Sequence, residues 1–353
     1  MHRRGDPVLI TGGCGFIGTH LAGHLAARGM SVVVADRVGW AGADPRVCAV
    51  RLDVADADGC RELVRSVRPA VVYHLAAAAT IDAAFADPHG SLRTNVCGTA
   101  AMLEATRAAA GGARFVLTST DKVYGELHGD AYSESSPLAA CGVYDVGKQS
   151  ADAITRLYGA ELGLSVAILR LCNVFGPGDP HTASRVVPRS LDRIFDPGGP
   201  LPPLVYAGAL RHGRDYVFVD DAVRALVAVG FDARADGEVF NMAAAAHRTT
   251  RALVEEIVAR SGAACAATDP GRAAAIAANG YTVVAGSPAR ALDRQHCDAS
   301  LLRTRLGFRP AVPLGTGLDR TISAVMAGRG CPATVPEAPS NGPARGYRRP
   351  AHT

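Results

Sequence analysis

This sequence has no long run of hydrophobic residues. A membrane-spanning helix needs roughly 18–20 consecutive apolar residues, and within these 353 residues Arg, Asp or His interrupts every apolar stretch sooner than that. A signal peptide would need a small-residue cleavage site after its apolar segment, but the chain after Met1–Asp6 runs into a glycine-rich loop. We therefore expect a cytoplasmic protein with no membrane partner.

Closely spaced cysteines are also missing. The nine cysteines are scattered along the chain, and no two of them form a Cys-x-x-Cys pair. Zinc ribbons and disulfide frameworks both depend on such spacing. The sequence therefore predicts no metal site and no disulfide framework, and most of the cysteines are expected to be small buried side chains in a reducing compartment.

Aromatic residues are scarce, at 5% of the chain, and the formal net charge is only +4. Part of the positive excess lies in Arg345, Arg348 and Arg349, within a Pro- and Gly-rich segment over residues 331–353. Such a segment buries too little apolar surface to order itself, which predicts a disordered tail. The alternative, a nucleic-acid patch, would need interleaved aromatics, so we expect no nucleic-acid partner.

The first two-thirds of the chain alternate strand-like and helix-like segments. The strand candidates are short β-branched or apolar runs, typical of strands covered on both faces: Val8–Thr11, Ser31–Asp36, Val47–Asp53, Ala70–Leu75, Arg114–Ser119 and Val166–Leu171. The helix candidates between them have apolar residues at helical spacing: Thr19–Arg28, Asp56–Val67, Ser91–Ala110 and Tyr144–Leu162. This order predicts an α/β protein with a Rossmann-like, doubly wound parallel sheet.

The pattern becomes less regular after Leu171, where Pro and Gly cluster. A further strand, helix and strand are expected at 215–219, 221–230 and 238–242, and another helix at 250–261. We expect two parts of the chain: a Rossmann domain formed by residues 1–173 together with 215–243, and a smaller C-terminal substrate-binding region formed by residues 174–214 and 244–328.

A glycine-rich loop follows the first strand. Gly12, Gly15 and Gly18 are spaced three residues apart, before a helix candidate. Glycines let the backbone approach a pyrophosphate without a Cβ clash, and the free N–H groups of a helix N-terminus attract that anion. With an acidic residue, Asp36, ending the second strand, the loop matches the dinucleotide-binding fingerprint. The alternative is a glycine turn of structural use only.

Acidic residues after the second and third strands extend this pattern. Asp36 would accept hydrogen bonds from a ribose diol and repel a 2′-phosphate, which favours NAD over NADP, with Arg37 beside it as the opposing signal. Asp53 and Val54 stand where the edge of an adenine ring is expected to rest. The alternative for Asp53 is a turn residue at the end of a strand.

Tyr144 and Lys148 are four residues apart and therefore share one face of a predicted helix. A positive charge near a phenol favours the phenolate, so Lys148 should lower the pKa of Tyr144 from its usual value near 10. The resulting phenolate can act as a general base that removes the proton of a sugar hydroxyl, while the carbon bearing that hydroxyl releases hydride to the cofactor. A pair at this spacing also occurs by chance.

The end of the fifth strand adds four polar residues, at the place where a doubly wound sheet presents active-site side chains. The hydroxyl of Ser119 or Thr120 can hydrogen-bond the same substrate hydroxyl as the phenol. Asp121 and Lys122 add one acid/base pair beyond what a simple oxidation requires. The alternative for this pair is a surface ion pair of little energetic weight.

In order along the chain, these motifs resemble the extended short-chain dehydrogenase/reductase family, the NAD-dependent epimerase/dehydratase group of nucleotide-sugar enzymes. The matching stretches lie within residues 7–325: Thr11–Gly18, His74–Ala77, Asn95–Thr99, Ser119–Gly125, Tyr144 with Lys148, Arg170–Pro177, Arg214–Asp221 and Leu306–Pro310. The resemblance implies a nucleotide-diphosphate-sugar substrate, a tightly held NAD that is reduced and reoxidised within one turnover, and a homodimer.

The resemblance also implies roles for individual residues. Cofactor contacts are expected from Gly12, Gly15, Phe16, Ile17, Gly18, Asp36, Asp53, Val54, Leu75, Ala76, Ala77, Asn95, Ser119, Tyr144 and Lys148. Asn173 would touch the substrate near its phosphates, and Arg214 would pair with the diphosphate. Arg185 and Arg290 are further candidates for that pairing, because a planar guanidinium matches phosphate oxygens. The alternative for each arginine is a solvated surface side chain.

The Asp121–Lys122 pair resembles the CDP-glucose 4,6-dehydratases, whereas the dTDP-glucose enzymes carry Asp-Glu and simple 4-epimerases carry small hydroxyl residues. We therefore expect a 4,6-dehydratase. Tyr144, helped by Thr120, removes the 4-hydroxyl proton. Lys122 takes the proton of carbon 5 if desolvation lowers its pKa. Asp121 then protonates the departing 6-hydroxyl. The alternatives are a 4- or 2-epimerase using the same tyrosine and lysine, and a catalytically silent NAD-binding protein.

Overall fold

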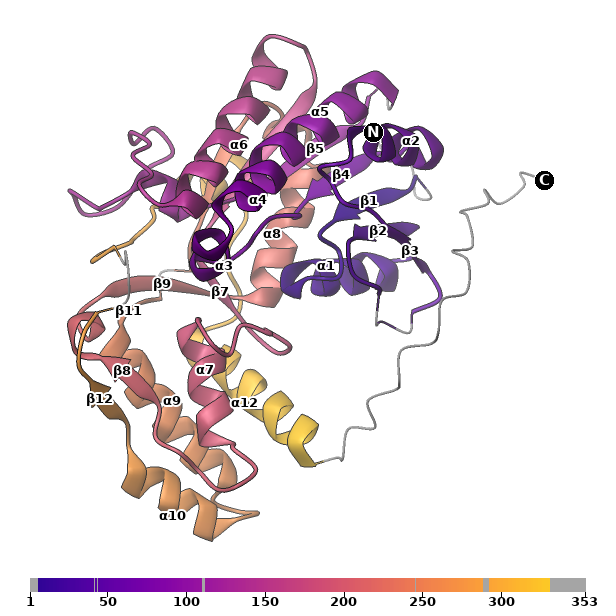
Figure 1. The fold of residues 1–353 in the computed structure, drawn as a ribbon. Coiled ribbons are helices and arrows are strands. Elements are labelled where there is room, and N and C mark those ends of the chain that lie inside the picture. The colour runs from indigo at the N-terminus through magenta and orange to yellow at the C-terminus, as the bar shows by residue number, and fades with distance from the viewer. Residues whose placement is uncertain are drawn as a thin grey trace.

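The computed structural model describes residues 6–330 apart from positions 41, 43, 110, 111, 245 and 288–291. Its centre is a parallel sheet of seven strands in the order β10-β6-β5-β4-β1-β2-β3, which we call the main sheet (Figure 1). Its strands are β1 (Val8–Thr11), β2 (Val32–Asp36), β3 (Val47–Arg51), β4 (Val71–His74), β5 (Arg114–Thr120), β6 (Ser165–Leu171) and β10 (Val239–Met242). Strand order reverses between β1 and β4, and the predicted doubly wound sheet is confirmed.

Alternate residues of the central strands face two separate hydrophobic cores. In β1, Val8 and Ile10 pack on one side of the main sheet, whereas Leu9 packs on the other. Helices α1 and α8 cover the first side, and α2, α5 and α6 cover the second. Their bounds are α1 (Phe16–Ala27), α2 (Ala57–Val67), α5 (Gly98–Ala109), α6 (Val143–Ala160) and α8 (Val219–Phe231). Burial on both faces explains why these strands are apolar throughout.

A smaller group of elements, which we call the small lobe, packs below the main sheet in Figure 1. Its strands form a three-stranded sheet, β11-β9-β7, and a separate pair, β12-β8. Their bounds are β7 (Asn173–Phe175), β8 (Leu204–Tyr206), β9 (Gly213–Phe218), β11 (His247–Thr249) and β12 (Thr282–Val284). The helices of the small lobe are α7 (Val186–Ile194), α9 (Thr250–Cys265), α10 (Pro270–Asn279) and α12 (Leu314–Gly330), while α11 (Ser300–Leu306) packs against β10.

Residues 215–243, expected in the Rossmann domain, divide between the two parts. Helix α8 packs on the main sheet and β10 extends its edge beside β6. Strand β9 instead pairs in parallel with β7 and antiparallel with β11. Strand β9 can pair there because β7, although it follows directly after β6, lies outside the main sheet and leaves one of its own edges open to β9.

The segment 91–110, expected to be one helix, forms consecutive elements. Helix α4 (Pro88–Leu92) is followed by a π-helical turn, η1 (Arg93–Cys97), and then by α5; a short helix α3 (Ile81–Ala86) precedes them. Helix α4 starts before the predicted position because Asp87 accepts a hydrogen bond from the Gly90 N–H at 2.9 Å and a proline stands at the first helical position. A π-turn widens the helix locally, often at functional sites.

The remaining predictions on the chain as a whole have mixed outcomes. Within the described residues, no helix is both long and apolar enough to cross a bilayer. The tail predicted as disordered, residues 331–353, lies outside the described residues. The described cysteines are all free, but only Cys60, Cys172, Cys265 and Cys297 are buried. The expectation that most of the cysteines are buried is therefore met by half of the eight described.

Candidate active site

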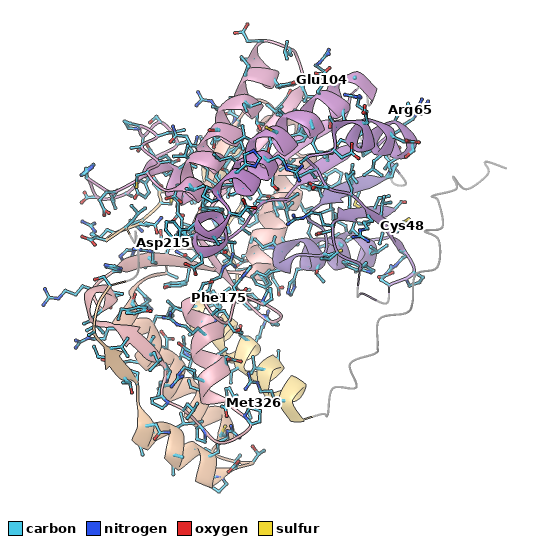
Figure 2. The ribbon with its side chains drawn as sticks, viewed as in Figure 1. Cys48, Arg65, Glu104, Phe175, Asp215 and Met326 are labelled. Carbon is cyan, nitrogen blue, oxygen red and sulfur yellow. The ribbon has the colours of Figure 1, made fainter. Side chains whose placement is uncertain are left out.

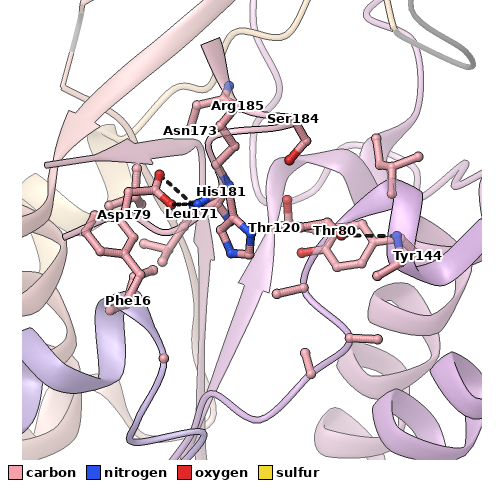
Figure 3. A pocket seen from close by; sticks show the side chains of 18 of the residues that line it. Phe16, Thr80, Thr120, Tyr144, Leu171, Asn173, Asp179, His181, Ser184 and Arg185 are labelled. Atoms are coloured by element: carbon pink, nitrogen blue, oxygen red, sulfur yellow. Dashed lines mark hydrogen bonds and ion pairs between the residues drawn. The ribbon is translucent and has the colours of Figure 1, made fainter. Parts of the chain in front are cut away.

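A cavity of about 1120 Å³ lies between the carboxyl ends of the main-sheet strands and the small lobe. Its wall includes the glycine loop, the ends of β2, β4 and β5, the start of α6, and residues of β7, α7 and β9. Figure 3 shows part of this wall from close by. The predicted site residues line it with two exceptions: Asn95 does not, and Arg290 lies outside the described residues.

The glycine loop approaches neighbouring backbone so closely that side chains are excluded. Gly12 has a φ of +68°, and a Cβ there would lie 2.6 Å from the Ala76 backbone nitrogen. A Cβ on Gly18 would lie 2.3 Å from the Gly12 carbonyl oxygen. Helix α1 begins at Phe16, and its N-cap, Gly15, offers no side-chain hydrogen bond. The first N–H groups of α1 are therefore free of a side-chain cap beside the cavity, as an anion site requires.

Asp36 ends β2 and lines the cavity. Its Oδ2 accepts a hydrogen bond from the Cys14 N–H at 3.1 Å, and its Oδ1 accepts one from the Arg37 N–H at 2.7 Å. These bonds fix the carboxylate beside the glycine loop. Oδ1 also accepts a hydrogen bond from the Val38 N–H at 3.3 Å, so the lone pair that remains available to a diol is on Oδ2. The exposed Arg37 also lines the cavity.

Asp53 and Val54 line the same end of the cavity. Asp53 Oδ1 accepts a hydrogen bond from the Ala55 N–H at 3.0 Å, and its Oδ2 forms an ion pair with Arg93 Nη2 at 3.1 Å. Asp53 is therefore both a turn residue after β3 and a residue of the cavity wall. Arg93, which comes from the π-turn, was not among the predicted site residues.

Asn95 lies behind the cavity wall. Its side chain is buried, and its Oδ1 accepts a hydrogen bond from the Ala78 N–H at 2.8 Å. The residues just before Ala78, Leu75 to Ala77, do line the cavity. Asn95 thus holds the loop after β4 in place, while its neighbour Thr94 reaches the cavity.

Lys148 is nearly fully buried, at 5% exposed, one turn into α6. Its Nζ donates a hydrogen bond to the Thr118 carbonyl oxygen at 2.5 Å. Burial lowers the pKa of Lys148 to about 8, and the negative charge of Asp152 acts in the opposite direction. The ammonium is therefore held at the end of β5, on the floor of the cavity.

The pKa expected for Tyr144 has to be corrected. Burial raises it to about 12 rather than lowering it, and the charges of Asp145 and Asp121 act in the same direction. Arg185 and a hydrogen bond with Thr120 oppose this shift without overcoming it. The prediction was wrong because it considered only the charge of the nearby lysine and left out desolvation of the phenolate. Figure 3 shows the side chains of Tyr144 and Thr120 next to each other in the cavity wall.

Asp121 and Lys122 lie in η2 (Asp121–Tyr124), a 3-10 turn directly after β5. Asp121 is 1% exposed; its Oδ1 accepts a hydrogen bond from Thr120 Oγ1 at 3.2 Å and lies 3.9 Å from Lys122 Nζ. Its Oδ2 is buried without a partner. Burial raises the pKa of Asp121, and Lys122 and Arg214 act in the opposite direction. A buried carboxyl with a free oxygen and a raised pKa suits a proton donor.

The pair is thus not the surface ion pair considered as its alternative. Lys122 Nζ also donates a hydrogen bond to Gln295 Oε1 at 3.3 Å. Gln295 was not predicted as a site residue; it lines the cavity from a segment 173 residues further along the chain. No motif around Gln295 signals this contact.

The predicted substrate residues that the structure describes line the small-lobe side of the cavity. Asn173 Nδ2 donates to the Asp215 carbonyl oxygen at 3.3 Å. Arg214 donates to the carbonyl oxygens of Gly213 at 2.8 Å and Asp293 at 3.1 Å, and to that of Leu292. Arg185 forms an ion pair with Asp179 at 3.3 Å. These partners aim the side chains and leave further donor groups for a ligand.

Arg189 also lines the cavity and was not predicted. Its Nη2 donates to the Leu204 carbonyl oxygen at 3.3 Å, and its Nε is buried without a partner. Arg189 lies four residues after Arg185, so the two share one face at the start of α7. This spacing was the signal in the sequence that could have identified it.

Comparison with known proteins agrees with this geometry. Residues 8–243 match the model of the NAD dependent epimerase/dehydratase family. A dTDP-glucose 4,6-dehydratase of Streptomyces griseus is 31% identical over 330 residues, which cover 90% of this chain and 93% of that protein. A dTDP-glucose 4,6-dehydratase of Neisseria meningitidis is 30% identical, with 89% and 92% of the two chains covered.

Solved structures give the same answer. The dTDP-glucose 4,6-dehydratase DesIV of Streptomyces venezuelae, with NAD and TYD bound, matches with a TM-score of 0.77 and 28% identity, over 92% of this chain and 98% of that one. A UDP-glucose 4-epimerase of Thermus thermophilus in complex with NAD matches with a TM-score of 0.74 and 30% identity, over 91% and 99%. The glycine loop, the main sheet and these matches together show that the chain belongs to the NAD-dependent epimerase/dehydratase family.

Proposed function

We propose that this protein is an NAD-dependent 4,6-dehydratase of a nucleotide-diphosphate sugar. The observation that carries the proposal is Asp121, a buried carboxyl with a raised pKa and a free oxygen beside Lys122. An oxidation alone needs only the Tyr144 and Lys148 pair. An elimination also needs an acid and a base. Relatives about 30% identical over about 90% of this chain are named dTDP-glucose 4,6-dehydratases.

The residues present fit NAD. The glycine loop gives the close approach that a pyrophosphate needs, Asp36 offers a carboxylate to a ribose diol, and Asp53 and Val54 border the end expected to hold adenine. When bound, NAD supplies a cationic nicotinamide that accepts hydride and returns it. We assign cofactor binding to residues 1–173 together with α8 and β10, and substrate binding to the small lobe.

Tyr144 is the base that removes the proton from the sugar 4-hydroxyl. With a pKa of about 12 in this structure, its phenol holds its proton at neutral pH, so its activity depends on nearby positive charge. Lys148 lies one helical turn away, and Arg185 lowers the pKa of the phenol. Thr120, hydrogen-bonded to the phenol, orients it toward the same hydroxyl.

Elimination follows at carbons 5 and 6. The ketone at carbon 4 acidifies the proton of carbon 5, which Lys122 removes as its neutral amine. Asp121 donates its proton to the departing 6-hydroxyl, which leaves as water. Lys122 would return that proton to carbon 5 as the hydride held by bound NAD is added to carbon 6, so that no external oxidant or reductant would be consumed. Gln295 holds the amine of Lys122 from the small-lobe side.

Cationic side chains hold the substrate diphosphate. Arg185, Arg189 and Arg214 line one side of the cavity, and Asn173 lies beside them. A guanidinium matches two phosphate oxygens at once, and the orphaned Nε of Arg189 is a donor that a ligand would satisfy. Neighbouring structures bind TYD or UDP-glucose by their descriptions, which supports a pyrimidine nucleotide.

Incubation of the purified chain with dTDP-, UDP- and CDP-glucose tests the proposal. We expect one of them to give a product lighter by one water molecule, detected by mass spectrometry. An Asp121→Asn variant should lose dehydration and yet still reduce bound NAD with the same sugar. No dehydrated product from any of these sugars, with NAD retained, would contradict the assignment.

A nucleotide-sugar epimerase is the second candidate. The 30% identity and 0.74 TM-score with a UDP-glucose 4-epimerase favour it. An epimerase would use the same tyrosine and lysine but leave Asp121 and Lys122 without a chemical task. A product of unchanged mass and inverted stereochemistry would select this candidate.

We propose a homodimer formed through the helices over one side of the main sheet. Leu92 on α4 and Val146 and Leu157 on α6 are exposed apolar residues, and α4 and α6 contact each other. A four-helix interface would cover these side chains. Sedimentation of the wild type as a dimer and of a Val146→Glu, Leu157→Glu variant as a folded monomer would support it, whereas a monomeric wild type would refute it.

We also propose a cytoplasmic location. The proposed reaction draws on NAD and nucleotide sugars, and the eight described cysteines are all free thiols, a state typical of a reducing compartment. Cell fractionation that finds the protein outside the cytoplasm would overturn this assignment.

A further inference from the structure

Three side chains outside the cavity wall come together where the small lobe meets the main sheet. Asp215 of β9 and His247 of β11 are direct partners in an antiparallel pair, so both project on the same side. His296 comes from the segment 292–297, which runs beside β9 through a bridge between Gly213 and Arg294. Figure 2 places Asp215 at this junction.

The distances between these side chains match the edges of a metal coordination shell. His296 Nδ1 lies 3.0 Å from each carboxylate oxygen of Asp215, and His247 Nδ1 lies 3.5 Å from Oδ1. One ligand atom from each residue falls within 4.8 Å of the others. Zinc ligands at about 2.0–2.1 Å in tetrahedral geometry lie roughly 3.3 Å apart, so the three atoms fit around one ion with small adjustments.

Several contacts hold the Asp215, His247 and His296 side chains in position. Asp215 is fully buried, and its Oδ2 accepts a hydrogen bond from the Cys297 N–H at 2.8 Å, which fixes the carboxylate. A Cβ on Gly213 would lie 2.4 Å from His247 Nε2, so glycine makes room for that ring. Most informative is His247 Nδ1, which is buried and has no hydrogen-bond partner closer than the 3.5 Å approach to Asp215 Oδ1. A buried nitrogen without a partner is costly.

We propose that Asp215, His247 and His296 bind one divalent transition-metal ion of the zinc class. Two imidazole nitrogens and one carboxylate oxygen form a common zinc ligand set. Each histidine side chain is about a third exposed, at 36% and 34%, so water can reach a fourth position. The ion satisfies His247 Nδ1, which the 3.0 Å hydrogen bonds between His296 and Asp215 leave with only a 3.5 Å contact to the carboxylate.

The ion serves a structural purpose, because none of its three ligands lines the cavity. It ties the segment 292–297 to β9 and β11. That segment brings the Leu292 and Asp293 carbonyl oxygens to Arg214, and Gln295 to Lys122. Metal binding therefore fixes the small-lobe wall of the cavity from behind, whichever sugar reaction the protein performs.

The test uses the full chain without a histidine tag, treated with a chelator and then dialysed. Titration with Zn²⁺ followed by calorimetry should give saturable binding of one ion per chain. Co²⁺ should give the intense visible absorption of a four-coordinate site. Zn²⁺ should also raise the melting temperature in a concentration-dependent way, because only the folded chain holds the site.

Variants locate the ion. His247→Gln and His296→Ala should each weaken Zn²⁺ binding at least roughly 10–100-fold, the range already seen when only a supporting residue is lost. The matched control is His89→Ala, because His89 is an exposed histidine on α4, and its affinity should equal that of the wild type. Circular dichroism checks that each variant is folded. Because two ligand variants are made, the test can still be read if one of them fails to fold. Absence of saturable binding by the wild type, or equal binding by all four proteins, would overturn the proposal.

Discussion

The two sides of the cavity are built in different ways. On the cofactor side, the glycine loop and the Tyr144–Lys148 pair each come from one short stretch of sequence. On the small-lobe side, Lys122 binds Gln295, 173 residues away, and Arg214 binds the Leu292 and Asp293 carbonyls. Local sequence therefore specifies the first side, whereas the second side exists only after distant segments pack together.

The largest expected effect lies on the cofactor side, in a Tyr144→Phe variant. Loss of the phenol removes the base, and general-base catalysis is worth about 10²–10⁴-fold, so turnover should fall by that factor. Retained NAD, measured after denaturation, should equal that of the wild type, because the glycine loop is untouched. Unchanged turnover would remove Tyr144 from the mechanism.

A Gly12→Ala variant tests whether one backbone position controls cofactor binding. Its φ of +68° and the 2.6 Å approach of a Cβ to Ala76 impose strain of about 1–3 kcal/mol, so retained NAD should fall sharply. Gly23→Ala in α1 is the matched control, since a Cβ there meets nothing within 4 Å. The control should keep its NAD and gain roughly 0.5–1 kcal/mol of stability in urea unfolding. Equal NAD retention by both variants would contradict this account of the loop.

On the small-lobe side, Gln295→Ala removes the acceptor of Lys122 Nζ. A hydrogen bond between neutral groups is worth about 0.5–1.5 kcal/mol net, so kcat for dehydration should fall roughly 2–10-fold as the amine loses its fixed position. NAD retention and the reduction of NAD by substrate should stay unchanged, because Gln295 does not touch the glycine loop. A fall in NAD retention would instead show that the two sides are not separable.

The smallest expected effect is a pH dependence from Lys148. Burial lowers its pKa to about 8, so turnover should decline as pH rises through that value and the ammonium is lost. The folded pKa lies below the ordinary 10.5, so the unfolded chain binds this proton more strongly. The contribution of Lys148 to stability therefore rises with pH between about 8 and 10.5. Across this window the measured turnover should fall while the contribution of Lys148 to the melting temperature rises. A turnover that increases above pH 8 would contradict a catalytic role for the Lys148 ammonium.

Much of the main sheet could be predicted from the sequence, because its strands are covered on both faces. Val8–Thr11 is predicted to the residue, and the other strands of this sheet lie within two residues of their predicted ends. Strand β9 was placed correctly along the chain, yet its pairing with β7 depends on where β7 leaves the main sheet. The pattern of apolar residues within β9 does not indicate which strand it pairs with.

The candidate site shows the same division. Contiguous motifs identified the glycine loop, Asp36 and the residues after β5, all of which line the cavity. They did not identify Gln295 or the Asp215–His247–His296 cluster, whose members lie 32 and 49 residues apart along the chain. The pKa of Tyr144 was predicted in the wrong direction because burial raises it. The burial of a side chain depends on the packing of distant segments, and the four-residue spacing of Tyr144 and Lys148 gives no information on that packing.

The most direct test of the account follows a deuterium atom through one turnover. The substrate is the accepted nucleotide sugar carrying deuterium at carbon 4, and the measurement is the mass and labelled position of the product. Because Tyr144 serves the oxidation and Asp121 and Lys122 serve the elimination within one cavity, we predict a dehydrated product that keeps the deuterium, now on carbon 6. A product that has lost no water, or one that has lost the deuterium to solvent, would contradict the account.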